Sequence, residues 1–229
     1  MKLSTIFKKD PVERGRQQCR KKFLHYFKNS FSDATYISWE RQYKLSAHFA
    51  FQQQLNKDEY SRLLKARKYA DIASRAVRLE SKTNLLFSFE KMALRDAVKE
   101  SAGARAFAQG LFKYVYGRLS LQERFETFSE TIAILPRKQT RVHTWPLQTV
   151  FGFIANPQEH IFLKPRITQI AAKKYGYNFD YKSKPNWNTY KSLIDFAEQI
   201  RKDVSDLSPH DYIDLQSFIW VMGSDEYPD

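Results

Sequence analysis

One set of charged residues in the sequence has the residue types of a metal-dependent nuclease. Asp71 precedes Glu80-Ser81-Lys82, and nucleases of the restriction type use an acid followed by Glu-x-Lys to hold a divalent metal and position a water molecule. Such sites stand on adjacent β-strands, whereas this stretch has the pattern of a helix. A solvated helix face is the alternative interpretation. A metal-dependent nuclease is therefore the third hypothesis for the function.

Other residues that could carry chemistry form no recognisable motif. No pair of histidines has the i, i+4 spacing of a helical metal site; they are His25, His48, His143, His160 and His210. Cys19, the single cysteine, has cationic neighbours that would lower the pKa of its thiol, but no partner completes a nucleophilic mechanism. The sequence also lacks a Gly-rich phosphate loop, a Gly-x-Ser-x-Gly elbow and a dinucleotide fingerprint. We therefore expect no metal and no cofactor, assign no catalytic residue and favour a non-catalytic role.

The charge of the chain is large and unevenly distributed. The net charge is +13 at pH 7. Residues 1–30 carry nine Lys and Arg against two acids, whereas residues 203–229 carry seven acids and neither Lys nor Arg. A basic body with an acidic segment suggests an anionic partner. Solubility alone would also account for the charge.

Basic residues with interleaved aromatic rings predict a nucleic-acid surface. Residues 173–184 read Lys-Lys-Tyr-Gly-Tyr-Asn-Phe-Asp-Tyr-Lys-Ser-Lys, in which cations can neutralise phosphates and rings can stack on bases. The alternative is that the rings pack inward. Three other basic regions could extend this surface: the first helix, a stripe on the helix at 69–82 and the loop at 137–141. The predicted nucleic-acid-binding residues are therefore Arg16, Arg20, Lys21, Arg75, Arg78, Lys82, Arg137, Lys138, Arg141, Lys173, Lys174, Tyr177 and Lys182.

These features lead to a first hypothesis and one alternative. The first is a non-catalytic nucleic-acid-associated protein that binds through a basic surface. The alternative is a helical protein–protein interaction module that docks an acidic partner and whose own acidic segment masks the basic face. Both require that distant basic regions meet on one side of the folded chain.

Composition sets the class of fold that must position these residues. Apolar residues make up 42% of the 229, aromatic residues make up 15%, and there are only 7 glycines, which favours a helical protein with a real core. No stretch approaches the roughly 18 apolar residues that span a bilayer, and the first ten residues lack the apolar run of a signal peptide. We therefore expect a cytoplasmic protein without membrane contact.

Caps and apolar spacing predict a mainly α, compact multi-helix globule of about nine or ten helices. The expected helices include 58–67, 69–82, 84–99 and 187–204, and a helix from Ser208-Pro209 onward. Between Ser32 and Gln54, the residues Trp39, Tyr43, Ala47 and Ala50 share one face. The segment 177–182 alternates with period two and predicts at most one short extended segment.

The chain divides into three parts by composition. Residues 1–30 form a basic leader and first helix, with residues 1–10 a loose leader. A basic, apolar-poor stretch from Pro136 to Thr144 predicts a boundary between two packed lobes, an N-terminal helical lobe at 31–135 and a C-terminal lobe with an acidic tail at 136–229.

Four segments resemble a family of uncharacterised bacterial cytosolic proteins with no assigned activity. They are Thr83–Asp96 (TNLLFSFEKMALRD), Ile161–Pro165 (IFLKP), Pro185–Tyr190 (PNWNTY) and Asp214–Val221 (DLQSFIWV). The resemblance covers most of residues 31–229. It implies a bacterial cytosolic setting and transfers no catalytic or binding residue.

Overall fold

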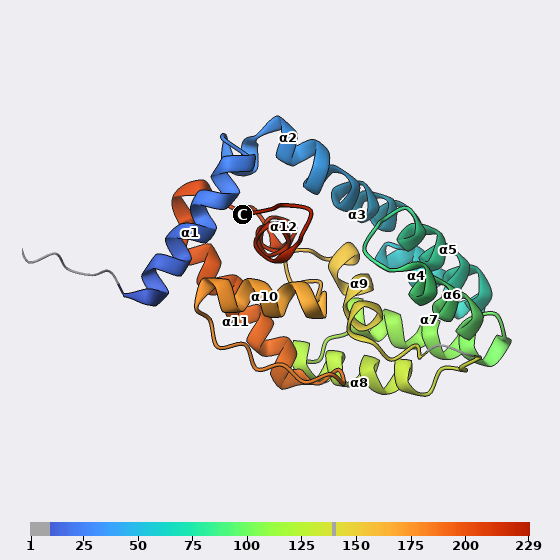
Figure 1. Cartoon of the computed structure of the whole chain (residues 1–229). Helices are drawn as coiled ribbons and strands as arrows, with labels where there is room; N and C mark the ends of the chain where they lie inside the picture. Colours follow the sequence, from blue (N-terminus) through green and yellow to red (C-terminus); the bar gives the residue numbers. More distant parts are fainter. Residues whose placement is uncertain (1–9, 139–140) are drawn as a thin grey trace, which may run out of the picture.

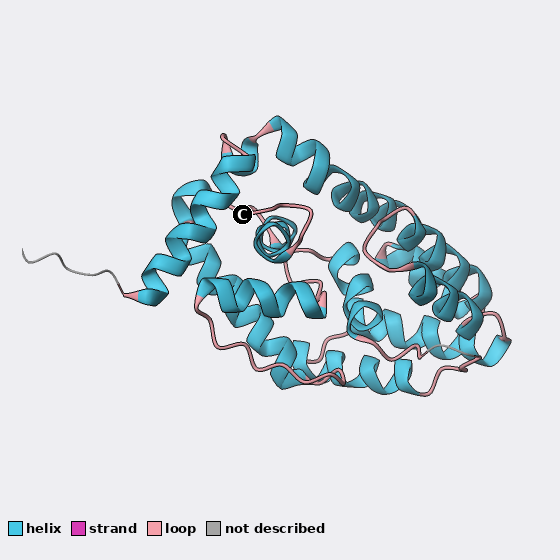
Figure 2. Ribbon diagram, in the orientation of Figure 1, coloured by secondary structure: helices cyan, strands magenta, loops and turns pink. Residues whose placement is uncertain are grey.

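The computed structural model describes residues 10–138 and 141–229, in which every regular element is a helix (Figure 1, Figure 2). The mainly helical fold is thus confirmed, with eleven helices where nine or ten are expected, besides the three-residue α2. The helices are α1 (Pro11–Tyr26), α2 (Ala34–Tyr36), α3 (Gln42–Leu55), α4 (Lys57–Lys65), α5 (Tyr69–Ser81), α6 (Ser88–Ala97), α7 (Ser101–Tyr116), α8 (Leu121–Ala133), α9 (Trp145–Ala155), α10 (Pro165–Tyr175), α11 (Trp187–Asp203) and α12 (Tyr212–Gly223).

Local capping interactions and one glycine mark where several helices begin and end. Asp10 accepts a hydrogen bond from the Val12 amide at the start of α1. Ser120 and Glu123 form a reciprocal capping box at α8, which satisfies two amides that the helix leaves without partners. Gly176 ends α10 with a φ of 76°, a left-handed conformation that glycine adopts without strain.

Helix α12 lies at the centre of the fold. Figure 1 shows it end-on, with α1, α10 and the region of α2 around it, and it packs on α1, α10 and α11. Nearly every residue of α12 is buried, which agrees with its apolar sequence. Helix α9 is likewise buried all round and packs against α3, α7 and α8.

The buried face of residues 39–50, which include the start of α3, differs in part from the expected one, because Ala47 is buried as expected and Trp39 is not. Trp39 is 59% exposed, whereas Glu40 and Lys44 are buried and pair with each other at 3.0 Å. The Lys44 ammonium also donates to Ser217, and the Tyr227 hydroxyl donates to Glu40. Because partners from α12 and the following segment satisfy both charges, a charged face can enter the core.

Two predicted helix starts are wrong. Helix α6 begins at Ser88 rather than Asn84, because Thr83 hydrogen-bonds back to Glu80 and residues 83–87 form a loop. Helix α12 begins after Asp211, whose carboxylate accepts from two amides. Ser208 has a φ of 57° and ends a short 3₁₀ turn, so Ser208-Pro209 does not start the helix.

The aromatic segment 177–182 is a loop laid along α11 rather than a strand. Tyr177 donates to the Ser192 carbonyl, and the Lys182 amide donates to Thr189. Tyr177 also stacks on Phe196 at 4.7 Å between ring centres. The side chains of α11 therefore take the place of a neighbouring strand.

Membrane contact, the lobe boundary and the leader are the remaining expectations. No helix in the described part of the chain is long and apolar enough to cross a membrane. The lobe boundary at residue 136 stays a prediction. The expected loose leader, apart from Asp10, lies outside the described residues.

Candidate functional site

Two adjoining cavities combine exposed aromatic rings with charged side chains. The first, of 690 Å³, is lined by Trp145, Phe89 and Arg141 among others, and we call it the Trp145 chamber. The second, of 520 Å³, is lined by Trp39 and Gln216 among others and is called the Trp39 chamber. Both are also lined by Phe87, Lys164, Trp220 and Glu226. We name the two chambers together the Lys164 groove.

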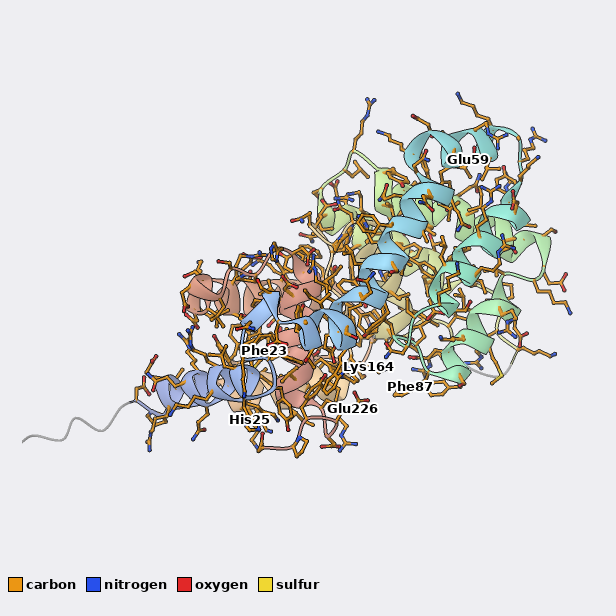
Figure 3. The ribbon with its side chains drawn as sticks, turned by 90° about the horizontal axis from the view of Figure 1, so that it is seen from above. Phe23, His25, Glu59, Phe87, Lys164 and Glu226 are labelled. Carbon is orange, nitrogen blue, oxygen red and sulfur yellow. The ribbon has the colours of Figure 1, made fainter. Side chains whose placement is uncertain are left out.

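Lys164 lies at the junction of the chambers, just before α10. Figure 3 shows it close to Phe87 and Glu226. Its ammonium donates to the Leu85 carbonyl at 2.9 Å and lies 3.9 Å from Glu90. Burial lowers the pKa of Lys164 and raises the pKa of Glu90, because each charged form loses water. The junction therefore carries a fixed, largely desolvated hydrogen-bond donor.

Exposed rings stand at the edge of the Trp145 chamber. Phe87 and Phe89 are 56% and 48% exposed, and their rings stack at 5.6 Å between centres with 24° between their planes. Phe87 ends the loop before α6 and Phe89 is in its first turn. Apolar rings held this far into solvent offer a flat surface on which another planar group can stack.

Two of the predicted basic regions converge at this chamber. Arg141 lines it, and His143 beside it has a pKa lowered by burial and by the charges of Lys184 and Arg141. The Trp145 indole donates to the carbonyl of Lys182 at 2.8 Å. The loop before α9 and the basic-aromatic segment before α11 thus meet at the rim. Arg137 and Lys138 are exposed in the same loop.

The Trp39 chamber contains a buried acceptor without a partner. The side-chain oxygen of Gln216 is buried and has no hydrogen-bond partner within the described residues. Its chamber is lined by the rings of Tyr43, Phe162 and Trp220. A buried amide oxygen without a donor costs free energy unless water or a ligand supplies one.

The remaining predicted cations lie elsewhere and are mostly paired with acids. Arg16 and Arg20 of α1 pair with Asp203 and Asp206. Lys174 pairs with Asp229, while Lys21 and Lys173 form no ion pair within the described residues. Because α1 packs on α10, the first helix and Lys173-Lys174 meet at a second surface. Tyr177 is stacked on Phe196, as the inward-packing alternative expects.

The stripe on α5 does not join these surfaces. Figure 1 and Figure 3 both place α1 and α5 at opposite ends of the molecule. Arg75 pairs with Asp71 and Glu59, and Arg78 donates to Ser74 on its own helix. Lys82, next to the loop that lines the Trp39 chamber, is exposed. A single basic face made of all three regions is therefore not formed.

Asp71 and Glu80 do not come together as one metal site. Both lie on α5, so nine residues separate them by roughly 13 Å along the axis. Asp71 binds Arg75, while the buried Glu80 faces Thr83 and Lys91. No cluster of three or more metal-ligating side chains occurs in residues 10–138 and 141–229.

The histidines and Cys19 have separate surroundings. His160 is fully buried beside Glu159 at 3.4 Å, and Arg124 pairs with that carboxylate. His210 is exposed and its ring nitrogen lies 2.9 Å from Asp214, which is buried. Cys19 is buried, which raises the pKa of its thiol to about 11. Burial thus outweighs the neighbouring cations, which by themselves would lower the pKa of this thiol.

Sequence reasoning missed Lys164 and Gln216. Lys164 closes the apolar run Ile161–Leu163 just before Pro165, and a lysine at the end of such a run is the one signal of its burial. Gln216 lies in the apolar sequence of α12, where a lone amide indicates either a core hydrogen bond or a site.

The Lys164 groove combines planar stacking surfaces, cations at one rim, the buried ammonium of Lys164 and the Gln216 side-chain oxygen, which has no partner in the described residues. Such a surface can hold planar rings and anionic groups side by side. No protein-family model, no curated protein and no solved structure matches this chain.

Proposed function

We propose that this protein binds single-stranded nucleic acid in the Lys164 groove without catalysing its cleavage. The observation that carries the proposal is the meeting of exposed rings with cations from two separate segments at one concave surface. Base stacking on aromatic side chains and neutralisation of phosphates are the two main contributions to such binding.

The rings at the chamber edge are the surfaces for bases. Phe87 and Phe89 expose about half of their area, and each base stacked on an aromatic side chain contributes about 1–3 kcal/mol. The chambers, of 690 and 520 Å³, have the size of small-molecule sites. They suit separated bases better than a duplex, which supports a single strand as the ligand.

The cations at the rim are the contacts for phosphates. Arg141 lines the Trp145 chamber, and Lys184 lies near enough to affect the pKa of His143. Lys182 is exposed next to them. None of these three cations forms an ion pair within the described residues, so their charges are available to a polyanion.

The acidic side chains of the groove determine on which side the phosphates of the ligand can lie. Glu90 is close to Lys164, while Asp225 and Glu226 are exposed. Because carboxylates repel phosphates, we place the backbone of the strand along the Arg141 side. Gln216 then faces a base in the Trp39 chamber, where an exocyclic amino group would supply the donor that its oxygen lacks.

A filter-binding titration with a labelled single-stranded oligonucleotide tests the proposal. We expect binding at ~50 mM salt that weakens steeply as salt is raised. Arg141→Ala should lower the slope of log K against log salt by about 1, because one phosphate contact is lost.

Arg118→Ala is the matched control. Arg118 is also exposed and precedes α8, whereas the loop of Arg141 follows it, which separates the two by about 20 Å of helix. This control should leave the slope unchanged. Absence of binding at ~50 mM salt, or equal effects of both variants, would exclude the groove as a nucleic-acid site.

A further inference from the structure

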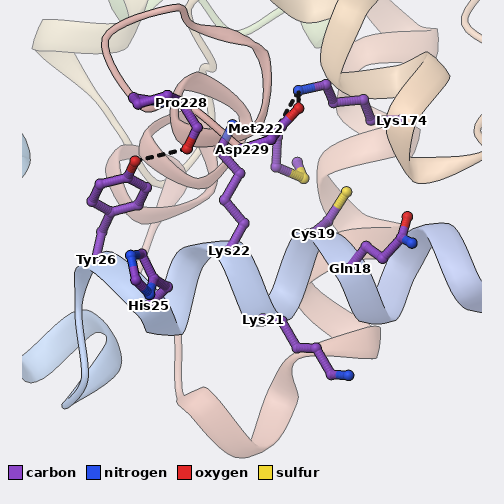
Figure 4. Close-up of a pocket in the computed structure, with 10 residues that line it drawn as sticks. All are labelled: Gln18, Cys19, Lys21, Lys22, His25, Tyr26, Lys174, Met222, Pro228 and Asp229. Carbon is purple, nitrogen blue, oxygen red and sulfur yellow. Dashed lines mark hydrogen bonds and ion pairs between the residues drawn. The ribbon is translucent and has the colours of Figure 1, made fainter.

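Another cavity, where α1 meets α10 and α12, is built around two lysines and the single cysteine. It has a volume of 760 Å³ and is lined by one face of α1, by Lys174 of α10 and by Met222 of α12 (Figure 4). We call it the Cys19 pocket. It contributes no residue to the Lys164 groove, so a role for this pocket is independent of the proposed function.

The carboxylate of Asp229 lies between two ammonium groups of this pocket. Lys22 approaches one oxygen at 2.7 Å, and Lys174 approaches both, at 2.8 and 2.6 Å. These hydrogen bonds lower the pKa of Asp229 to about 2. The Lys22 side chain is only 11% exposed, so its charge has little water to stabilise it.

Asp229 is the single acid among the residues that line the pocket in the described part of the chain. Without it, Lys22 and Lys174 would face the cavity with no counter-charge. One carboxylate balances one of these charges, whereas a phosphate group carries up to two. The pocket is therefore short of negative charge even when Asp229 is in place.

The segment that carries Asp229 is anchored in the core by Tyr227, two residues before it. Tyr227 is buried, donates to Glu40 and packs edge-on against Tyr26. Pro228 and Asp229 are exposed and are held by the Tyr26 hydroxyl and the two lysines. The contacts that hold Pro228 and Asp229 are therefore separate from the core contacts of Tyr227.

We infer that the Cys19 pocket is a binding site for a phosphate group, and that Asp229 occupies it as an exchangeable internal ligand. Lys22 and Lys174 bind the phosphate oxygens as they bind the carboxylate. The Tyr26 hydroxyl, released from the Pro228 carbonyl, becomes a further donor. The cavity space beside Gln18 and His25 accommodates the rest of a phosphomonoester.

Cys19 provides a built-in reporter of this exchange. It is the only thiol of the chain, and it lines the same pocket. The charge of Asp229 raises the pKa of this thiol, whereas Lys174 and Lys22 lower it. Replacing the acid therefore both opens the pocket and favours the thiolate, which is the reactive form.

The experiment measures the rate at which neutral iodoacetamide alkylates Cys19 in the full chain, with inorganic phosphate as the probe. Asp229→Asn should react faster than the parent protein, because the charge that raises the pKa of the thiol and the side chain that fills the pocket are both changed. Inorganic phosphate should slow Asp229→Asn again, because no tethered carboxylate then competes with it for Lys22 and Lys174.

Two controls separate the inference from a general loosening of the fold. Asp225→Asn changes an exposed acid of the same segment that lies outside the pocket, and it should behave like the parent protein. Lys22→Met combined with Asp229→Asn should lose protection by phosphate. The inference is overturned if Asp229→Asn reacts at the parental rate, if phosphate gives no protection, or if protection survives the loss of Lys22.

Discussion

The ammonium of Lys164 lies 3.5 Å from the centre of the Phe87 ring while it donates to the carbonyl of Leu85. One lysine thus holds both the backbone and the exposed ring of the loop before α6. Lys91 donates in the same way to the Thr83 carbonyl. The loop that bears the stacking surface is therefore held by two cations from outside it as well as by local hydrogen bonds such as that of the Phe87 amide to Glu90.

Replacing Lys164 should destabilise the fold. Lys164→Met leaves Glu90 buried without its cation and Leu85 without a donor, so we expect a loss of about 3 kcal/mol in the free energy of unfolding. Urea denaturation measures it. Adding Glu90→Gln should recover part of the loss, because the unpaired charge is removed. If the losses of unfolding free energy in Lys164→Met and Glu90→Gln simply add in the double variant, the two side chains do not interact.

The stability of the protein should fall below about pH 6.5 because of His160. Burial lowers the pKa of His160 in the folded state, so the unfolded state takes up the proton first and stability is complete only above the unfolded pKa. Urea midpoints measured at about pH 7.5 and about pH 5.5 should differ more in the parent than in His160→Gln, and an equal difference would contradict this.

Glu159 affects the stability of the fold at a lower pH than His160 does, so the two contributions can be measured separately. The His160 ring at 3.4 Å and the hydrogen bond from Arg124 lower the pKa of Glu159 to about 2. Its contribution is therefore present above the unfolded pKa of about 4.3 and is lost as pH falls toward 2. His143, whose pKa is also lowered, contributes in the window of His160. The comparison with His160→Gln removes that contribution.

The Asp214 carboxylate should be worth far more to stability than an exposed ion pair. It accepts from the Tyr36 hydroxyl at 2.5 Å and from Arg41 at 2.6 Å, and it is completely buried. Asp214→Asn should cost about 3–5 kcal/mol because the buried Arg41 charge loses a partner. Asp195→Asn, in an exposed pair with Lys191, should cost less than about 1 kcal/mol. Similar costs in thermal unfolding would refute the comparison.

Removing the exposed ring of Phe87 should weaken oligonucleotide binding equally at all salt concentrations. Stacking involves no counterion release, so Phe87→Ala should lose about 1–3 kcal/mol of binding free energy with an unchanged salt slope. Phe49→Ala, at a ring that is also 56% exposed but lies outside the groove, should have no effect. A change of slope in Phe87→Ala would assign the loss to phosphate contacts instead.

Much of the fold could be predicted because its signals are local. Ser120 and Glu123 mark the start of α8, and Gly176 marks the end of α10, through interactions that span a few residues. Helix α6 could not be placed as well, because Thr83 and Lys91 hold the preceding residues as a loop. Helix propensities along a sequence do not indicate such a contact.

The site was harder to predict because it is made by distant segments. Arg141 and Lys182 could be proposed from the sequence, but their meeting depends on the indole of Trp145. Conversely, Arg16 and Arg20 have the pattern of available cations in the sequence, whereas the fold places Asp203 and Asp206 opposite them. A sequence gives the number of cationic residues, whereas binding of an anion depends on which of these residues have no acidic partner in the fold.

The distribution of tryptophan gives the groove its own optical signal. Of the four tryptophans in the chain, Trp39, Trp145 and Trp220 line the Lys164 groove, and Trp187 lies beyond its lining. Three of the four indoles that give the intrinsic emission of the protein thus line the groove. A stacked base would quench that emission, so occupancy can be followed by fluorescence without a label on either molecule.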